Sequence, residues 1–417
     1  MSHPGSERLY HDDPYLTSFQ ATVTSCEPAP DGRSATLTLD RTAFYPESGG
    51  QPDDRGRLSG WPVIRVIEDE ATGRVLHVLG PAPADGSPET WPVVGSLVDG
   101  EIDPARRGDH RQHHAGQHLL SAAFEKLCDA NTVGFHLGAE VVTIDLDKAS
   151  IPAEDLDRVE DLANAVVLED RPIIPHWMTW EEASRLPLRK PPTRREGIRI
   201  VEVGDFDWSP CGGTHPARTG EIGPIKIIGL DRVRQSLRVV FVCGGRAIRD
   251  YRLKDHISRG LAGLLSVPPA EVLEAARKTL EQAEAHRKAL TEAREALIAQ
   301  EAEALWAEAE ALPDGRRLAV RRFEGRPMAE LRLLCGRLTA HPRTTAVLGT
   351  TDGNQAQVAM ARSADLADLD LRLVIKEVLP AIGGRGGGSP VVVQGGGPEA
   401  GGLDGALAKA RTLIAGI

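Results

Sequence analysis

The sequence has few cysteines, no long apolar run and no excess of positive charge. Its five cysteines are odd in number and widely spaced, which excludes a disulfide framework and favours a reducing cytoplasm. The longest apolar run, at about 239–243, is far shorter than the ~20 residues that a bilayer-spanning helix requires. We therefore expect a cytoplasmic protein with no membrane partner.

The formal net charge of -11 argues against an anionic partner, but the local charge departs from this average. Residues 316–417 contain fourteen Lys and Arg against nine Asp and Glu, a charge of +5 that leaves -16 on the rest of the chain. A second basic segment, 185–199, has six basic residues and one acidic residue. These zones are either ordinary solvated surface or contact sites for a polyanion such as nucleic acid.

The length of 417 residues predicts two to four domains. Short strands with turn signals between them fill 19–103, and the runs 63–67 and 74–79 flank a turn as in a hairpin. This pattern predicts a small β-barrel. A helical pattern follows at 106–127, and mixed α/β patterning continues to about residue 242. The Pro- and Arg-rich stretch 186–195 is expected to be a surface loop.

After Pro268-Pro269 the composition changes to Ala, Glu, Arg and Leu as far as Leu312. This segment predicts a helix of roughly 65 Å with a thin apolar seam, which is typical of an antiparallel arm or spacer. The last hundred residues predict a separate, glycine-rich α/β unit. We therefore predict an α+β multidomain fold with four parts. These are a small β-barrel domain at 1–103, an α/β domain at 104–250, a long helical arm at 251–315 and a C-terminal α/β glycine-rich domain at 316–417.

Four histidines lie between residues 110 and 118. On a helical wheel His113 falls with the apolar residues, whereas His114 and His118 project together on the opposite face. Two imidazoles at i and i+4 can bind one metal ion, although such a pair alone is more often solvated. Ala115 stands where the metalloprotease helix carries a glutamate base, which excludes that class.

Cys211-Gly-Gly-Thr-His215 offers a second pair of donors in a tight glycine loop. Together with the histidine pair it supplies the nitrogen and sulfur ligands that zinc prefers, so we predict a site formed by His114, His118, Cys211 and His215. Four protein ligands normally close a structural site. A catalytic ion needs an open position, so one ligand, most plausibly His215, would have to be loose or replaced by water. Alternatively, the metal orients the substrate and organises the pocket without activating a nucleophile. The sequence leaves both readings open.

These motifs resemble a known family. His114-x-x-x-His118 with Leu119-Leu120, and Cys211-Gly-Gly-Thr-His215 with 219–223 after it, are similar to the editing domain of alanyl-tRNA synthetase and the free-standing AlaX-type editing proteins. Upstream, 39–51 resembles the family's glycine-containing motif in the preceding domain. Downstream, 383–390 and 394–397 resemble the synthetase's C-terminal domain, which also occurs in DHH-type phosphoesterases. Since only about eighteen residues precede the predicted barrel, we expect no aminoacylation domain and the long free-standing form.

The resemblance implies that 104–250 is a zinc-containing editing domain with one Zn²⁺ held by the four donors. It implies a trans-editing hydrolase that deacylates tRNA(Ala) mischarged with serine, with glycine as a second candidate. Thr42 and the Gly49-Gly50-Gln51 loop are expected to line the amino-acid pocket. The Thr42 hydroxyl would recognise the serine hydroxyl, its alternative role being that of a strand-end residue. The general base is not identified.

Arg385 with Gly386, Gly387 and Gly388 is expected to contact tRNA phosphates, a flexible surface loop being the alternative. A DHH-type phosphoesterase is excluded because Asp255-His256 is followed by isoleucine. A non-catalytic tRNA-binding module with a structural zinc remains the alternative function. A homodimer through the helical arm or the C-terminal domain is left open.

Overall fold

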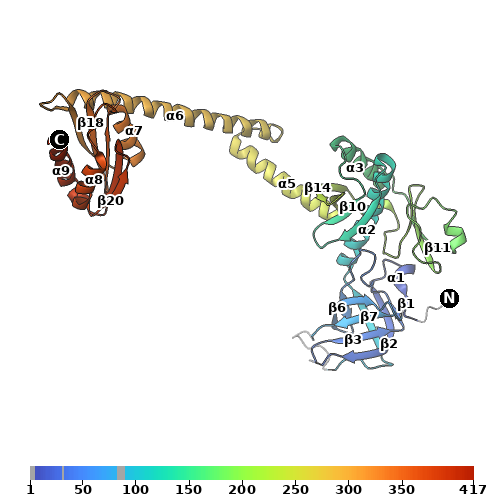
Figure 1. Ribbon diagram of the computed structural model, residues 1–417. Coiled ribbons are helices and arrows are strands. Elements are labelled where there is room, and N and C mark those ends of the chain that lie inside the picture. Colours follow the sequence, from blue (N-terminus) through green and yellow to red (C-terminus); the bar gives the residue numbers. More distant parts are fainter. Residues whose placement is uncertain (1–4, 31, 82–89) are drawn as a thin grey trace. The chain divides into compact units, whose positions relative to one another are not determined.

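The computed structural model describes residues 5–30, 32–81 and 90–417 (Figure 1). Contacts between Cα atoms divide the chain into two compact units, Met1–Gly260 and Leu261–Ile417. Within the described part of the chain, no helix is both long enough and apolar enough to cross a bilayer. The mixed α+β multidomain class is confirmed, whereas the four domain boundaries stay a prediction.

A closed six-stranded barrel begins the first unit, as the sequence predicts. Its strand order is β2 (Ser18–Pro28), β3 (Ala35–Leu39), β7 (Val75–Leu79), β6 (Trp61–Glu68), β5 (Gly56–Leu58) and β8 (Leu97–Ile102). The predicted hairpin is formed by β6 and β7, which pair antiparallel. Alternate residues of β7 point inward because successive side chains of a strand face opposite sides. Leu37, Phe44 and Leu79 are among the residues that fill the barrel.

The segment before the barrel folds against it. β1 (Glu7–Arg8) pairs in parallel with β4 (Arg41–Thr42), and the short helix α1 (Leu9–Asp12) follows β1 directly. This arrangement buries Tyr10 and brings His11 to the backbone of Gly212, whose carbonyl oxygen lies 3.2 Å from His11 Nε2. The sequence predicted no secondary structure for this segment.

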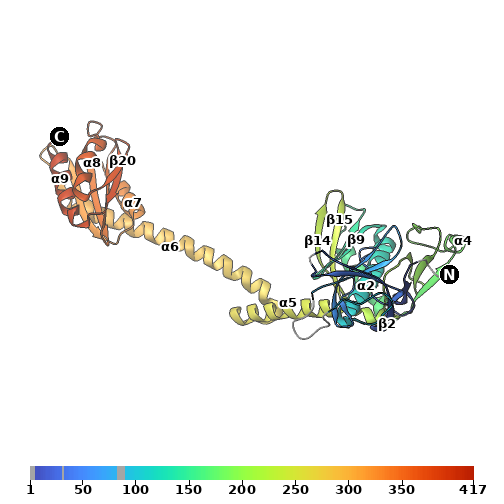
Figure 2. The same cartoon turned by 90° about the horizontal axis from the view of Figure 1, so that it is seen from below.

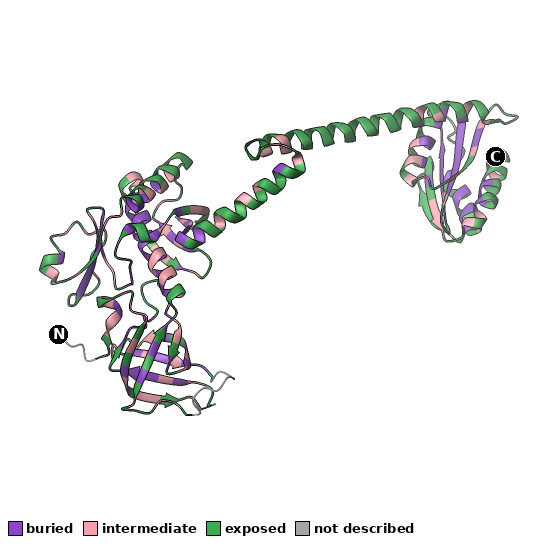
Figure 3. Cartoon of the chain, turned by 180° about the vertical axis from the view of Figure 1, so that it is seen from behind, coloured by how far each residue is buried: buried purple, intermediate pink, exposed green. Residues whose placement is uncertain are grey.

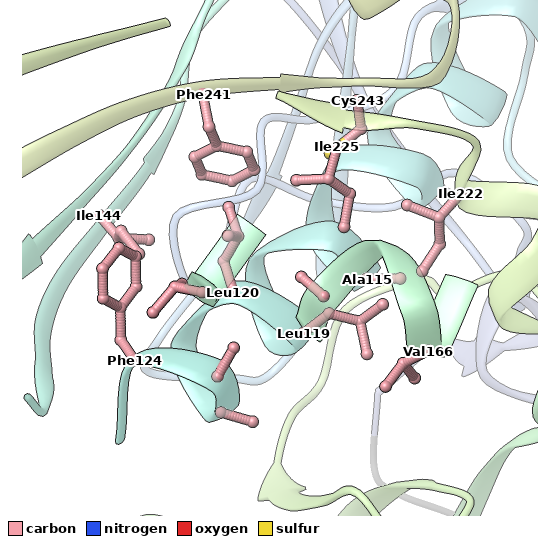
Figure 4. Close-up of a cluster of buried hydrophobic side chains, with 14 of the residues drawn as sticks. Ala115, Leu119, Leu120, Phe124, Ile144, Val166, Ile222, Ile225, Phe241 and Cys243 are labelled. Atoms are coloured by element: carbon pink, nitrogen blue, oxygen red, sulfur yellow. The ribbon is translucent and has the colours of Figure 1, made fainter. Parts of the chain in front are cut away.

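Helix α2 (Pro104–Cys128) leads out of the barrel. It begins at Asp103, whose carboxylate accepts hydrogen bonds from the backbone N–H groups of Ala105 and Arg106, and a proline occupies its first turn. The predicted helix at 106–127 is thus confirmed. Figure 4 shows its apolar face, where Leu119, Leu120 and Phe124 pack against strand and helix residues of the first unit.

Two sheets complete the first unit. The four-stranded sheet has the order β14 (Ile225–Val233), β15 (Ser236–Cys243), β10 (Val142–Leu146) and β9 (Thr132–Leu137), with β14 and β15 forming a hairpin (Figure 2). The three-stranded sheet has the order β11 (Ile173–Met178), β12 (Ile198–Val203) and β13 (Asp207–Pro210). Helices α3 (Ala153–Leu168), α4 (Trp180–Ala183) and η1 (Thr219–Ile222) connect these strands. The predicted irregular loop lies between α4 and β12.

The barrel and α2 are joined by a buried ion pair. Arg107 on α2 contacts both carboxylate oxygens of Asp54 through Nε at 3.1 Å, and both side chains are fully buried. The Arg107 guanidinium also donates to the backbone oxygens of Ala43 and Pro14. The Asp54 carboxylate accepts the N–H of Tyr45 at 2.7 Å. This pair therefore fixes the start of α2 against the barrel.

The second unit is built on a six-stranded sheet. Its order is β16 (Glu310–Ala311), β17 (Arg317–Glu324), β18 (Thr344–Asp352), β19 (Gln355–Arg362), β21 (Val392–Gly397) and β20 (Arg385–Gly388). Helices α8 (Leu371–Val378) and α9 (Leu403–Ala415), with the short turns η3 (Leu379–Ile382) and η4 (Ala400–Gly402), lie by one face of the sheet, and α7 (Met328–Leu338) packs on the other.

The predicted long helix after Pro268-Pro269 is a single helix in the structure, and a separate helix precedes it. α5 (Gly244–Leu265) is followed by η2 (Pro269–Glu271) and then by α6 (Val272–Glu308), whose 37 residues span ~56 Å. The expected end at Leu312 is wrong, because β16 pairs with β17 from Glu310 onward. α6 is exposed along most of its length (Figure 3). Its buried residues, Ile298, Ala302 and Leu305, pack with α7.

We expect Asp54→Ala to lower the unfolding free energy of the first unit by about 3 to 5 kcal/mol, because it leaves the Arg107 guanidinium buried without its carboxylate. Asp145→Ala is the matched control. It breaks a half-exposed ion pair with Arg238 on paired strands and should cost about 0 to 1 kcal/mol. Urea unfolding followed by circular dichroism measures both, and equal midpoints for the two variants would contradict the role given to Asp54.

Candidate metal centre

The structure brings His114, His118, Cys211 and His215 together, and their donor atoms all lie within 4.8 Å of one another. Two of these residues come from successive turns of α2 and two from the loop after β13. The Nε2 atoms of His114 and His215 each lie 3.2 Å from Cys211 Sγ. His113 points away from this group, as the helical wheel predicts, and its Nε2 accepts the N–H of Cys243 on β15. The predicted spacing thus gives one compact set of donors.

His114 is oriented by Gln51. The Nδ1–H of His114 donates to Gln51 Oε1 at 2.7 Å, which leaves the Nε2 lone pair facing the group. The same Oε1 accepts the N–H of Thr214 at 3.1 Å, and Gln51 Nε2 donates to Thr214 Oγ1 at 2.9 Å. One amide side chain therefore holds both the helix ligand and the ligand loop.

Close packing explains the glycine at position 213. A Cβ atom there would lie 2.1 Å from Cε1 of His114, which is closer than real Cβ contacts. Gly213 therefore lets the loop backbone approach the imidazole ring. Its N–H also lies 3.4 Å from Cys211 Sγ.

His118 is oriented by a carboxylate. Its Nδ1–H donates to Asp207 Oδ2 at 2.9 Å, and Asp207 in turn receives Arg189 Nε at 3.0 Å and the hydroxyl of Ser209 at 2.9 Å. Burial opposes ionisation of Asp207, but the hydrogen bond from His118 and the charge of Arg189 outweigh it and lower the pKa of Asp207 to about 2. A carboxylate behind a ligating histidine is a common support of metal sites. Neither Asp207 nor Arg189 was predicted as a site residue, because no local sequence pattern links them to His118.

Cys211 and His215 have protonation states suited to metal binding. Burial opposes a thiolate, yet the charge and the hydrogen bond of His114 hold the pKa of Cys211 well below its ordinary value. Burial lowers the pKa of His215 to about 3, so its imidazole is neutral. His215 Nδ1 is buried and has no hydrogen-bond partner among the described residues. His215 therefore lacks the support that His114 and His118 have.

The donor set fits zinc. Three imidazole nitrogens and one thiolate are ligands that zinc binds in tetrahedral sites. Nδ1 of both helix histidines is engaged by an oxygen acceptor, so Nε2 is the free donor in each.

The glycine loop before the metal group is a tight turn. The backbones of Ser48 and Gln51 exchange two hydrogen bonds, and Gly49 and Gly50 between them both have positive φ, at 57° and 86°. Such turns require residues that tolerate the left-handed region at both central positions. The turn presents Gln51 to the metal group, whereas the carbonyl oxygen of Gly50 accepts the N–H of Leu137 on β9.

Thr42 makes its hydrogen bonds within the barrel. Its hydroxyl is buried and lies 2.8 Å from His77 Nε2, and it accepts the N–H of Phe44 at 3.1 Å. These described partners belong to the barrel and not to the four metal donors. Its predicted role in the amino-acid pocket stays a prediction.

Arg385, Gly386, Gly387 and Gly388 lie in the second unit and form β20, the edge strand paired with β21. The alternative of a flexible loop is therefore wrong. A hollow of about 360 Å³ is lined by Arg385, Gly386 and Gly387 together with Gln394 and others. Contact with tRNA stays a prediction.

One protein family matches a short segment of this chain, and several known proteins match nearly its whole length. The family described as "Threonyl and Alanyl tRNA synthetase second additional domain" matches residues 198–240. The alanine–tRNA ligase of Natronomonas pharaonis is 33% identical over 99% of this chain, but the chain spans only 44% of that ligase. A crystal structure of the C-Ala domain from Aquifex aeolicus alanyl-tRNA synthetase aligns with 26% of this chain and 97% of that domain at 24% identity, with a TM-score of 0.25, which is too low to support a structural inference.

The alanyl-tRNA editing protein AlaX-L of Pyrococcus horikoshii is matched over nearly its whole length. It is 30% identical over 397 residues, which cover 93% of this chain and 94% of that protein. This relative and the chain therefore share the same extent. The match confirms the resemblance drawn from the sequence motifs, and the chain belongs to the family of long-form alanyl-tRNA editing proteins.

Proposed function

We propose that this chain is a trans-editing hydrolase that deacylates tRNA(Ala) carrying the wrong amino acid, serine in the first place and glycine as a second substrate. The observation that carries the proposal is the set of four converging donors, His114, His118, Cys211 and His215, in a chain of this family. The ester bond that links an amino acid to tRNA is already activated. Its hydrolysis therefore requires orientation and polarisation more than a strong nucleophile.

Zinc bound by the four donors would supply a Lewis acid for the ester carbonyl or a fixed point for the substrate. The chain itself supplies the geometry. Gln51 and Asp207 fix the two helix imidazoles, and Gly213 lets the ligand loop approach them closely. His215 has no comparable support, which favours it as the ligand that yields an open position. The burial of all these groups limits competing water around the ester.

A second contact with the tRNA is proposed for the glycine-rich edge of the second unit. Arg385 is exposed beside glycines that lack side chains, so a phosphate can approach both its guanidinium and the backbone. Two weak contacts on one large ligand raise affinity through effective concentration. In this proposal the second unit contributes to tRNA binding, and the first unit hydrolyses the ester.

The purified protein is expected to hold about one zinc per chain, and Cys211→Ala is expected to lose both the zinc and the hydrolysis of Ser-tRNA(Ala). Cys128→Ala is the matched control, because Cys128 lies at the end of α2 away from the donors and is only partly buried. Elemental analysis measures the metal, and release of serine from mischarged tRNA measures the activity. Zinc without any hydrolysis by the intact chain would favour the non-catalytic tRNA-binding module.

Thr42→Val is expected to weaken discrimination between Ser-tRNA(Ala) and Ala-tRNA(Ala) by about 1 to 3 kcal/mol. A hydroxyl has one donor and two acceptor positions. Because the ring of His77 and the N–H of Phe44 occupy two of these, one acceptor position remains for a serine hydroxyl. The ratio of kcat/KM for the two substrates tests the prediction. A variant that is less stable but has an unchanged ratio would show that Thr42 serves only the barrel.

A chain that ends after Ser266, beyond the last residue of α5, is expected to keep its zinc and to hydrolyse mischarged tRNA at saturating concentration. Its KM should rise and should depend less steeply on salt, because fewer phosphates are neutralised. The cut is placed there because the last turns of α6 pack in the core of the second unit. Equal KM values and equal salt slopes for the truncated and intact chains would refute a tRNA contact in the second unit.

A further inference from the structure

The loop that carries Cys211 and His215 is supported unevenly along its length. Its first half, 211–214, accepts hydrogen bonds from the side chains of Arg199 and Gln51. Its second half begins at His215, whose Nδ1 has no hydrogen-bond partner among the described residues. The position of this imidazole therefore depends on what holds the loop backbone after it.

The backbone after His215 is held at Ala217. The residue between them is Pro216, which has no N–H, so the first backbone donor after the histidine is the N–H of Ala217. The hydroxyl oxygen of Tyr15 accepts this N–H at 2.7 Å. The carbonyl oxygen of Ala217 accepts the N–H of Ile173 on β11 at 2.8 Å. Ala217 is thus held once by the backbone of a sheet strand and once by the side chain of Tyr15.

The Tyr15 hydroxyl uses both of its hydrogen-bonding roles. A phenol has one proton to donate, and a backbone N–H can only donate, so the oxygen of Tyr15 accepts from Ala217 and its proton goes elsewhere. It goes to the carboxylate of Glu221, whose two oxygens lie 2.6 and 2.8 Å from the hydroxyl oxygen. Glu221 lies on η1, shortly after Ala217 in the chain. The hydroxyl therefore joins the end of the ligand loop to the turn that follows it.

Tyr15 is also attached to α2. The guanidinium carbon of Arg111 lies 3.8 Å from the centroid of the Tyr15 ring, which is a cation–π contact. The carbonyl oxygen of Pro14 accepts hydrogen bonds from Arg107 at 3.0 Å and from Arg111 at 3.4 Å. His114 follows Arg111 by about one turn of the same helix. Tyr15 therefore links the helix that carries two of the metal donors to the loop that carries the other two.

We propose that Tyr15 is a positioning residue of the metal centre, whose hydroxyl holds the end of the ligand loop that presents His215. The inference rests on the proposed function, because it concerns the ligand that is proposed to yield an open position. The hydroxyl binds the loop backbone and not a donor atom. It adds a second bridge between the two pairs of donors, the first being Gln51, which joins His114 to Thr214. Because Tyr15 is 40% exposed, burial of its ring alone does not account for these contacts.

Tyr15→Phe in the full-length chain tests the proposal, because it removes the hydroxyl and keeps the ring beside Arg111. We expect the zinc affinity to fall about tenfold, as for the loss of an outer partner of a metal ligand. Competition with a chromophoric chelator measures this affinity. Tyr251→Phe is the matched control, since Tyr251 on α5 is 70% exposed and its hydroxyl makes no hydrogen bond among the described residues.

Cobalt bound in place of zinc gives a second measurement. Tetrahedral cobalt has intense ligand-field bands, which weaken when the number of ligands rises above four. We expect these bands to weaken in Tyr15→Phe, because a displaced His215 lets water reach the metal. The absorption from the Cys211 thiolate should remain, since the first half of the loop keeps its support.

Tyr15→Ala separates the hydroxyl from the ring. If the hydroxyl positions the loop, the Phe and Ala variants lose zinc affinity to a similar extent. A normal affinity for Tyr15→Phe together with a loss for Tyr15→Ala would show that the ring only packs against Arg111, and would overturn the proposal. Identical cobalt spectra for Tyr15→Phe and the intact chain would overturn it as well.

The outcome is separate from that of the hydrolysis assay. An intact chain that releases no serine would refute the proposed function, yet a fall in zinc affinity with Tyr15→Phe would still establish the role of Tyr15 at a structural zinc. A chain that releases serine and whose zinc affinity is unchanged by Tyr15→Phe would retain the proposed function and lose only the role of Tyr15.

Discussion

The arrangement of the first unit depends on the buried ion pair between Arg107 and Asp54. It fixes the first turns of α2 against the barrel, and His114 follows two turns later on the same helix. This alignment brings the Ser48–Gln51 turn to the ring of His114, which donates to Gln51. The metal group is therefore assembled from distant segments, and its geometry depends on the junction between the barrel and α2.

Gln51 has a structural role that the sequence did not suggest, because it holds His114 and Thr214. Its place in the lining of the amino-acid pocket, together with Gly49 and Gly50, stays a prediction. Its amide oxygen accepts hydrogen bonds from His114 and Thr214, and its amide nitrogen donates to the Thr214 hydroxyl. Backbone geometry therefore explains the two glycines without any substrate contact, because both positions have positive φ in the turn that directs Gln51 toward the metal donors.

Local patterns in the sequence predicted local features well. The hairpin of β6 and β7, the helix around His114 and the separation of His113 from His114 all follow from periodicity. Long-range partners could not be found in this way. Asp207 and Arg199 look like ordinary strand residues until β12 and β13 pair beside α2. The end of α6 was missed because its composition continues to Ala311, while pairing with β17 overrides helix propensity there.

Arg199 connects the ligand loop to a cavity of about 250 Å³ that Cys211 and Gly212 also line. Its guanidinium holds the carbonyl oxygens of Cys211 and Gly213, and the same side chain faces the cavity. Any anion that draws this guanidinium toward itself changes the free energy of the loop that presents two metal donors. Linkage of this kind is reciprocal, so an anion bound in the cavity would change the affinity of the loop for a metal ion, and a metal ion held by the loop would change the affinity of the cavity for the anion.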